Sequence, residues 1–183
     1  MNEDDELLKR FVQGESVAAR ILIEKYSPQL YRMACRSLGN TSDAEEIVQE
    51  TMVRLWQFAP KWEPGKARIS TWLWRVASNL CIDRIRERER FIDKATEEVD
   101  ASESQVAGLI HQDRIRAIQI ALGQLPAKQN QVIVLKYFEG HGNKEVAQIM
   151  SASVESIEGL YSRGMKKMRE ILMDQHSTLG WKE

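Results

Sequence analysis

Cysteine, proline and histidine are all scarce in this sequence of 183 residues. The two cysteines, Cys35 and Cys81, cannot form the framework of a disulfide-rich secreted domain and are expected to be small buried hydrophobes. No apolar run approaches the ~18 residues that a membrane span needs. The acidic start, MNEDDELLKR, lacks the apolar segment of a signal peptide. These absences predict a cytoplasmic, reduced protein that does not insert into a membrane.

The residue patterns of common catalytic and metal sites are also missing. His111, His141 and His176 lie too far apart for HExxH spacing, and the chain has neither a CxxC pair nor a glycine-rich phosphate loop. The carboxylates are spread over expected helix faces. We therefore expect no catalytic residues, no metal site and no cofactor.

Charge is balanced overall but unevenly distributed, with 26 Lys and Arg against 27 Asp and Glu. Residues 1–92 carry a net charge of +1, residues 93–112 of −4 and residues 113–183 of +2. The acidic stretch has no large apolar residue between Ile92 and Val99, so it cannot bury a core of its own. We predict one domain at 1–92, a linker at 93–112, a second domain at 113–176 and a tail at 177–183.

Apolar residues recur with helical spacing in four regions, and alternation typical of strands occurs nowhere. The regions are residues 7–23, 42–58, 69–90, and 113 to about 173, the last broken at 125–126, at 140–142 and near 151. Ser42 and Glu45 have capping-box spacing at the start of the second region. The pattern predicts an all-α fold of two small helical domains.

The last region contains a pattern typical of a helix-turn-helix. Ala147 is small enough for close helix crossing, a turn follows at residues 150–152, and Ser153 is a good N-cap for the next helix. Ile157 and Leu160 give that helix a buried face, to which Met168 can add. In such motifs the second helix enters the DNA major groove. The alternative is an ordinary helix pair with a charged outer face.

The region at 69–90 combines tryptophan with arginine. Trp72 belongs to the apolar stripe, whereas Trp74 lies about 200° away around the helix, which favours a role outside the core. Basic residues interleaved with aromatic rings are typical of single-stranded DNA binding. The alternative is a solvated helix with local ion pairs, such as Arg84 and Arg88 beside Glu87. The polar face of 42–58 is likewise either solvated or a protein-docking surface.

Taken in this order, the segments resemble a bacterial sigma factor of the extracytoplasmic-function (ECF) group. DAEEIVQETMVRLWQF is similar to sigma region 2.2, and STWLWRVASNLCIDRIRERER to regions 2.3 and 2.4. ALGQLPAKQNQVIVLKYFEGHGNKEVAQIM, with the helix that follows, is similar to region 4. The resemblance covers about residues 5–173. It implies a transcription initiation factor, monomeric when free, that directs core RNA polymerase to promoters and is held inactive by an anti-sigma factor.

The resemblance also implies binding residues. The first domain would dock on the β′ clamp helices of the polymerase through Asp43, Glu46, Gln49, Glu50 and Arg54. It would read the −10 element as a melted strand, with the loop PKWEPGKAR capturing a flipped base; the residues are Trp62, Lys66, Arg68, Ser70, Thr71, Trp72, Trp74, Arg75, Ser78, Asn79, Arg84 and Arg86. The second domain would bind the β flap and read the −35 duplex through Lys144, Ser153, Glu155, Ser156, Glu158, Gly159, Ser162, Arg163, Lys166 and Lys167.

Two departures from the family pattern keep other functions open. Many members have glycine where this chain has Ser151, and a left-handed turn there would cost serine conformational energy. Many have a Lys-Ser-Arg-like run at Glu158-Gly159-Leu160, and glutamates would repel phosphate, although a glutamate can accept from cytosine N4. The chain could therefore be a sigma-like protein that sequesters an anti-sigma factor without reading promoters. A simple helix-turn-helix repressor would leave the first domain unexplained.

Overall fold

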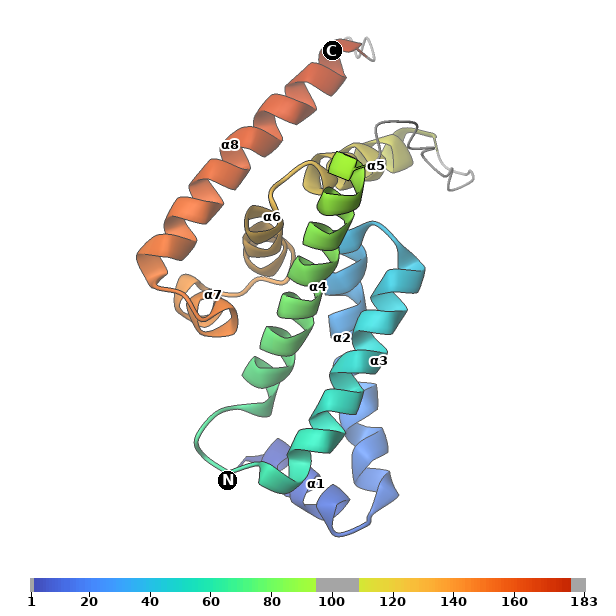
Figure 1. Ribbon diagram of the computed structural model, residues 1–183, viewed down its shortest axis with the longest axis vertical. Coiled ribbons are helices and arrows are strands. Elements are labelled where there is room, and N and C mark those ends of the chain that lie inside the picture. The colour runs from blue at the N-terminus through green and yellow to red at the C-terminus, as the bar shows by residue number, and fades with distance from the viewer. Residues whose placement is uncertain (1, 95–108, 179–183) are drawn as a thin grey trace.

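The computed structural model describes residues 2–94 and 109–178, and both parts are helical, with no strand in either (Figure 1). The first part contains α1 (Glu3–Val12), α2 (Ser16–Leu38), α3 (Thr41–Phe58), the 3-10 turn η1 (Ala59–Lys61) and α4 (Ile69–Lys94). The second contains α5 (Leu109–Gly123), α6 (Ala127–Ile133), the π-helical turn η2 (Val134–Phe138), α7 (Asn143–Met150) and α8 (Val154–Thr178). The all-α prediction is confirmed. Across these two ranges, no helix has both the length and the apolar content to span a bilayer.

In the first part, α2, α3 and α4 run alongside one another, and α1 lies across one end (Figure 1). Their facing stripes bury Leu22, Leu30, Leu55 and Leu73 almost completely. Each such side chain contributes about 1.5–3 kcal/mol by leaving water. The bundle therefore holds α4 rigidly, and α4 carries most of the residues expected at the −10 strand.

The first periodic region forms two helices rather than one. Helix α1 ends at Val12, and Gly14 takes a φ of +95° in the turn before α2. Only glycine adopts that conformation without steric cost, so the chain reverses there while the apolar spacing continues. Helix α2 then runs through Pro28, which lies on the exposed side of the helix, where a missing backbone N–H costs least.

Helix α3 begins one residue before the predicted region. Its N-cap is Asn40, whose side-chain oxygen accepts from the Asp43 amide at 3.0 Å. The predicted cap at Ser42 is wrong, because Asn40 precedes it and is an equally good capping residue. The error moves the boundary without changing which face of α3 is buried.

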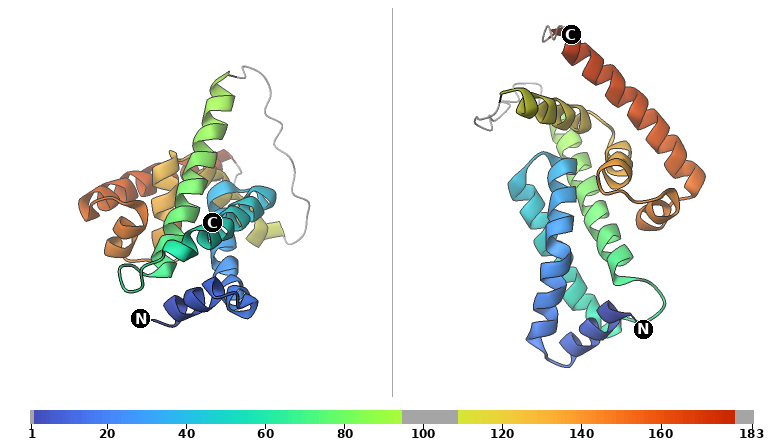
Figure 2. Two further views of the ribbon diagram at one scale, coloured as in Figure 1. Left: turned by 60° about the horizontal axis from the view of Figure 1, so that its bottom comes forward. Right: turned by 180° about the vertical axis from the view of Figure 1, so that it is seen from behind.

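The second part packs on the first. Helices α6 and α7 lie against α4, α5 lies against α2, and α8 is outermost (Figure 2). Helix α4 extends to Lys94, and α5 begins at Leu109. Most of the expected linker, residues 95–108, and the end of the expected tail, residues 179–183, lie outside the described residues.

The helix-turn-helix is present at α7 and α8. The predicted turn is present, and Ser151 takes the left-handed conformation at φ 51° and ψ 48°, which costs a serine more than a glycine. Ser153 caps α8 by accepting from the Ser156 amide at 3.2 Å, and Ile157 is fully buried, so both predictions are confirmed.

Helices α6 and α8 cross closely at Gly164. A Cβ placed there would lie 2.9 Å from Ile133 Cδ1 and 3.3 Å from Gln129 Cβ. A Cβ on Gly159 would meet only the mobile end of Arg163, at 3.2 Å. Two glycines in one helix therefore have opposite environments.

We expect Gly159→Ala to stabilise the protein by up to about 1 kcal/mol, because alanine is the better helix former. Gly164→Ala should not stabilise the protein, because overpacking against α6 costs about 1–3 kcal/mol and cancels the gain in helix propensity. Urea denaturation of both variants measures the difference. Equal stability of the two would contradict the close crossing.

Candidate nucleic-acid interface

Helix α4 and the loop that precedes it carry the residues expected at the −10 strand. The structure sorts them by environment into an exposed set, a half-buried set at the base of the loop, a set at the contact with the second domain, and Arg84, which pairs with α3. In the exposed set are Lys66, Arg68, Asn79 and Arg86. These four are available to a nucleic acid without any rearrangement.

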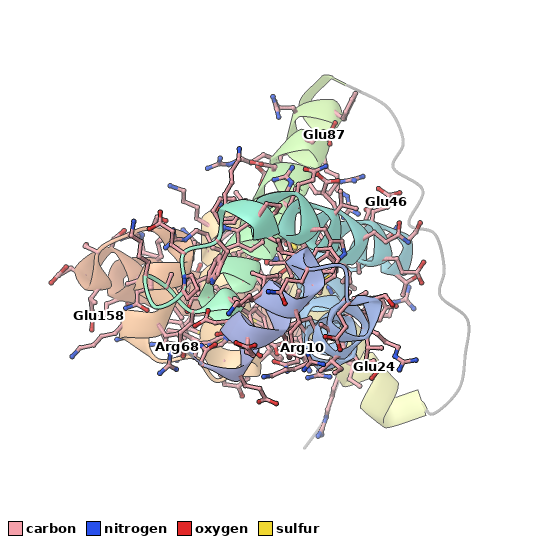
Figure 3. All side chains as sticks on the ribbon, turned by 90° about the horizontal axis from the view of Figure 1, so that it is seen from below. Arg10, Glu24, Glu46, Arg68, Glu87 and Glu158 are labelled. Carbon is pink, nitrogen blue, oxygen red and sulfur yellow. The ribbon has the colours of Figure 1, made fainter. Side chains whose placement is uncertain are left out.

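The loop at 62–68 projects from the end of the first domain near α1. Residues 63–68 are all exposed, and Lys66 Nζ pairs with Glu63 at 2.5 Å. Figure 3 looks onto this end of the molecule; Arg68 and Glu158 are labelled on one side of α1 and Glu46 on the other. Backbone and cationic groups of this loop are thus open to solvent.

Three aromatic rings form the base of the loop. Trp72 stacks on Phe58 with centroids 5.4 Å apart and planes 4° from parallel, and Trp62 meets Phe58 edge-on at 6.1 Å. Trp62 and Trp72 are half-buried, as are Ser70 and Thr71 at the start of α4. The exposed edges of the two tryptophans leave surface on which an unpaired base can stack.

Trp74 contradicts the sequence interpretation that it lies outside the core. Its side chain is 5% exposed, and its ring meets His141 of the second domain edge-on at 4.7 Å. Arg75 beside it donates from Nη2 to the carbonyl oxygen of Gln148 at 2.7 Å. Trp74 is off the stripe that faces α2 and α3, but a second partner covers it. In this arrangement Trp74 cannot contact DNA.

A buried polar network fixes the contact between the domains. The Gln131 side chain accepts from Ser37 Oγ at 2.9 Å and donates to Ser78 Oγ at 3.0 Å. Asn130 Nδ2 donates to the Ser37 carbonyl at 3.1 Å. Ser78, a predicted base contact, is completely buried here. A side chain of α6 therefore bridges α2 and α4.

Further contacts surround this network. Arg36 of α2 pairs with Glu139, and Gln119 Nε2 donates to the Arg36 carbonyl at 2.8 Å. The glutamate side chain is 7% exposed, so water screens the pair little. Polar groups from both domains thus pair with each other across the contact.

Arg84 pairs with α3 rather than within its own helix. It donates to Asp43 at 3.0 Å and to Glu46 at 2.8 Å, and the hydrogen bond to Glu46 is the main cause that raises the pKa of Arg84 further. Arg88 also pairs with Asp43 and donates to the Leu38 carbonyl at 2.7 Å. These arginines do not form the expected local pairs with Glu87, because the carboxylates of Asp43 and Glu46 on α3 lie within bonding distance.

The remaining residues of the expected core-docking face stay accessible. Gln49, Glu50 and Arg54 are exposed on α3, and Arg54 Nε donates to Glu50 at 2.8 Å. Val53, 46% exposed, lies between them and adds apolar surface. The expected five-residue face therefore divides into an internally paired half, Asp43 and Glu46, and an open half.

The start of α8 presents most of the expected −35 residues to solvent. The exposed ones are Lys144, Ser153, Glu155, Ser156, Glu158, Ser162, Arg163, Lys166 and Lys167, and Gly159 is half-buried. Glu158 accepts from Asn143 Nδ2 at 2.9 Å, which ties it to α7. Bonds from its own amide and from Ser153 lower the pKa of Glu155, and its negative charge in the first turn is favourable at the positive end of the helix dipole.

An apolar groove in the second domain was missed by the sequence analysis. Its volume is about 670 Å³, and it lies between α5, η2 and the far half of α8, lined by Ile118, Ile133, Phe138, Met165, Met168 and Leu172. The spacing of Met165, Met168 and Leu172 is the signal that could have found it, since it continues the apolar face of α8 beyond the recognition segment. A groove of this kind suits an amphipathic helix.

Two family models match the chain: Sigma-70 region 2 over residues 22–91 and Sigma-70, region 4 over residues 115–168. The ECF RNA polymerase sigma factor SigW of Bacillus subtilis is 29% identical over 179 residues, covering 91% of this chain and 95% of that protein. The ECF RNA polymerase sigma factor SigE of Mycolicibacterium smegmatis is 30% identical over 162 residues, covering 86% of this chain and 62% of that protein.

Solved structures show the same fold. CnrH in complex with the cytosolic domain of CnrY matches with a TM-score of 0.69 at 24% identity, over 94% of this chain and 99% of that one. The sigma factor RpoE from Bartonella quintana, in complex with the anti-sigma factor NepR, matches with a TM-score of 0.63 at 24% identity, over 84% and 96%.

We expect Gln131→Ala to loosen the contact between the domains. The change leaves the Ser37 and Ser78 hydroxyls without their bridge at a buried site, a loss of about 1–3 kcal/mol, or roughly 5- to 150-fold in the equilibrium between closed and open domains. A larger radius of gyration by small-angle X-ray scattering and faster hydrogen exchange in α4 would report it.

Gln129→Ala is the matched control, because Gln129 lies on the same helix but faces Gly164 of α8, and its buried Oε1 has no partner among the described residues. If Gln131→Ala is as compact and as protected as Gln129→Ala, the network does not hold the domains together.

Proposed function

This chain belongs to the ECF group of the sigma-70 family and is therefore a transcription initiation factor that directs RNA polymerase to promoters, and we propose that its two domains divide the reading of the −10 and −35 elements between them. The first domain reads the melted −10 strand with the loop at 62–68 and α4. The second reads the −35 duplex with the start of α8. The chain itself catalyses no reaction and works beside the polymerase in the cytoplasm.

One observation carries the proposal for the first domain. An exposed loop with two cations, Lys66 and Arg68, rises from the half-buried rings of Trp62 and Trp72. Cations hold the strand backbone while rings stack on unpaired bases. Extruding a base costs a few kcal/mol, and these contacts offset that cost at the right sequence.

Promoter reading requires the domains to separate first. Trp74 and Ser78 are covered by α6 and α7 in the arrangement described, so they reach the −10 strand only after the second domain moves away. We interpret the compact arrangement as the state of the factor without polymerase. Binding to the polymerase, with the domains apart, supplies the free energy that opening costs.

For docking on core polymerase we propose the open half of the α3 face: Gln49, Glu50, Val53 and Arg54. These side chains combine one apolar residue with groups of both charges, a composition that favours specific over non-specific binding. Asp43 and Glu46 support this face indirectly, because their pairs with Arg84 brace α3 against α4.

For the second domain we assign the apolar groove to the β flap of the polymerase. Met168 follows Ser156 by twelve residues on α8, about 18 Å along the axis, so the groove and the DNA-reading end can be occupied together. The methionines in its lining adapt their shape to a docked helix. The first domain contacts α5, α6, η2 and α7, but no residue of the first domain is among those that line the groove.

An anti-sigma factor is the regulatory partner that we propose. The fold is shared with CnrH and RpoE, which were solved with CnrY and with an anti-sigma factor. A second candidate function, sequestration of an anti-sigma factor without promoter reading, draws on the exposed Glu155 and Glu158 at the start of α8.

Run-off transcription separates the two functions. Purified core polymerase is supplied with a fragmented genomic library, with and without the protein, and the 5′ ends are sequenced. New starts that share −10 and −35 elements are the result we expect. Core binding without new starts would overturn promoter reading. Neither core binding nor new starts would leave sequestration as the better account.

Glu50→Lys should weaken core binding at least about tenfold, because it reverses a charge at the docking face and frees Arg54. Unfolding should be unchanged, since an exposed ion pair contributes about 0–1 kcal/mol. Glu24→Lys on α2 is the control, because Glu24 is exposed and pairs weakly with Arg20 at 4.0 Å. Affinity is measured by titration of labelled protein with core enzyme. Equal affinities of the two variants would remove this docking face.

A further inference from the structure

Two adjacent carboxylates of α1 are buried, and no role discussed so far uses them. Asp4 is 9% and Asp5 2% exposed. A buried carboxylate is costly unless it is well bonded. Helix α1 also precedes the part of the chain that the region 2 model matches, residues 22–91. Asp5 bonds to Trp62 at the start of the base-capture loop, and Asp4 bonds to Lys25 and Tyr26 of α2.

Asp5 holds the start of the loop. Its Oδ1 accepts from Trp62 Nε1 at 2.9 Å, across 57 residues of sequence. Its Oδ2 accepts from the Asn2 amide at 3.1 Å, and Asn2 Oδ1 accepts from the Asp5 amide at 2.8 Å. The bond from the Asn2 backbone amide holds the carboxylate on α1, so the indole of Trp62 is held in turn.

Asp4 holds α1 against α2. Its Oδ2 accepts from the Tyr26 hydroxyl at 2.5 Å, and its Oδ1 pairs with Lys25 at 2.6 Å. Burial raises the pKa of Tyr26, and Ser70, the second residue of α4, opposes that rise, so Ser70 lies near the Tyr26 oxygen. Helix α1 therefore bonds to Trp62 directly and to the α2 tyrosine that lies near the start of α4.

The loop between these anchors has little of its own to hold it in shape. Residues 63–68 are all exposed, and Gly65 takes a φ of +84°. Figures 1 and 2 place α1 at the end of the first domain where this loop emerges. The conformation of the loop thus depends on where Trp62 and Ser70 are held.

We propose that α1 positions the base-capture loop, with Asp5 acting through Trp62. The proposal rests on the function proposed above for the loop. Asp5 is a positioning residue and does not touch DNA. Its effect is confined to the −10 position whose base enters the loop.

The test uses holoenzyme and a promoter mapped by the run-off experiment. Every −10 position is varied through four bases, and open-complex formation is measured on each template. Asp5→Ala should lower discrimination about tenfold at the one position read by the loop and leave neighbouring −10 positions and the −35 element unchanged. Trp62→Phe, which lacks the indole donor, should show the same position-specific loss, and the double variant should lose little more.

Two controls separate positioning from general damage. Asn2→Ala removes the side-chain cap of the same helix but leaves the Asp5–Trp62 bond, so its discrimination should match wild type. Asp5→Asn keeps an acceptor oxygen for the indole and should recover most of the loss. Thermal denaturation identifies any variant that fails to fold. If Asp5→Ala does not fold, the discrimination of Trp62→Phe tests the proposal instead.

Unchanged discrimination in Asp5→Ala, an equal loss at every position, or the same loss in Asn2→Ala would overturn the proposal. Failure of the function itself has a different outcome, since wild-type holoenzyme would then open no promoter at all.

Discussion

Helix α4 has two neighbouring faces that must leave water, and the arrangement of the molecule follows from how each is covered. One face, with Leu73, Ala77 and Cys81, is buried against α2 and α3. The next, with Trp74 and Ser78, is buried against α6 and α7. Burying a tryptophan removes about 150–250 Å² from water, worth about 4–6 kcal/mol. The other half of the same chain thus keeps water away from a surface that we propose to meet DNA.

Apolar burial alone would allow the two domains to pack in several ways. Directed polar contacts select one, because the Gln131 amide must meet two hydroxyls and Arg75 must reach the Gln148 carbonyl. Such groups have water to bond to once the domains part. The closed arrangement is therefore specific, and the open arrangement leaves none of these polar groups without a hydrogen-bond partner. Both properties suit a factor that alternates between a free and a polymerase-bound state.

The sequence predicted features that depend on neighbours in the chain. The all-α fold, the turn at Ser151 and the cap at Ser153 all follow from spacing and local chemistry, and the structure contains them. Periodicity could not predict what covers a helix face. Trp74 was misjudged because its partner, His141, lies 67 residues away, and Arg84 because Asp43 comes from another helix. The hydrogen bond between Asp5 and Trp62 and the apolar groove were not predicted, for the same reason.

Helix α8 runs for 25 residues without interruption, a rod of about 37 Å. Its first turns, which we propose to read DNA, are exposed, and its far half lines the apolar groove. Because a straight helix does not bend between its ends, a partner bound in the groove would also fix the direction of the first turns. If the polymerase is that partner, the spacing of the two promoter elements is set by where it holds one end of a single helix, rather than by the length of the chain between the domains.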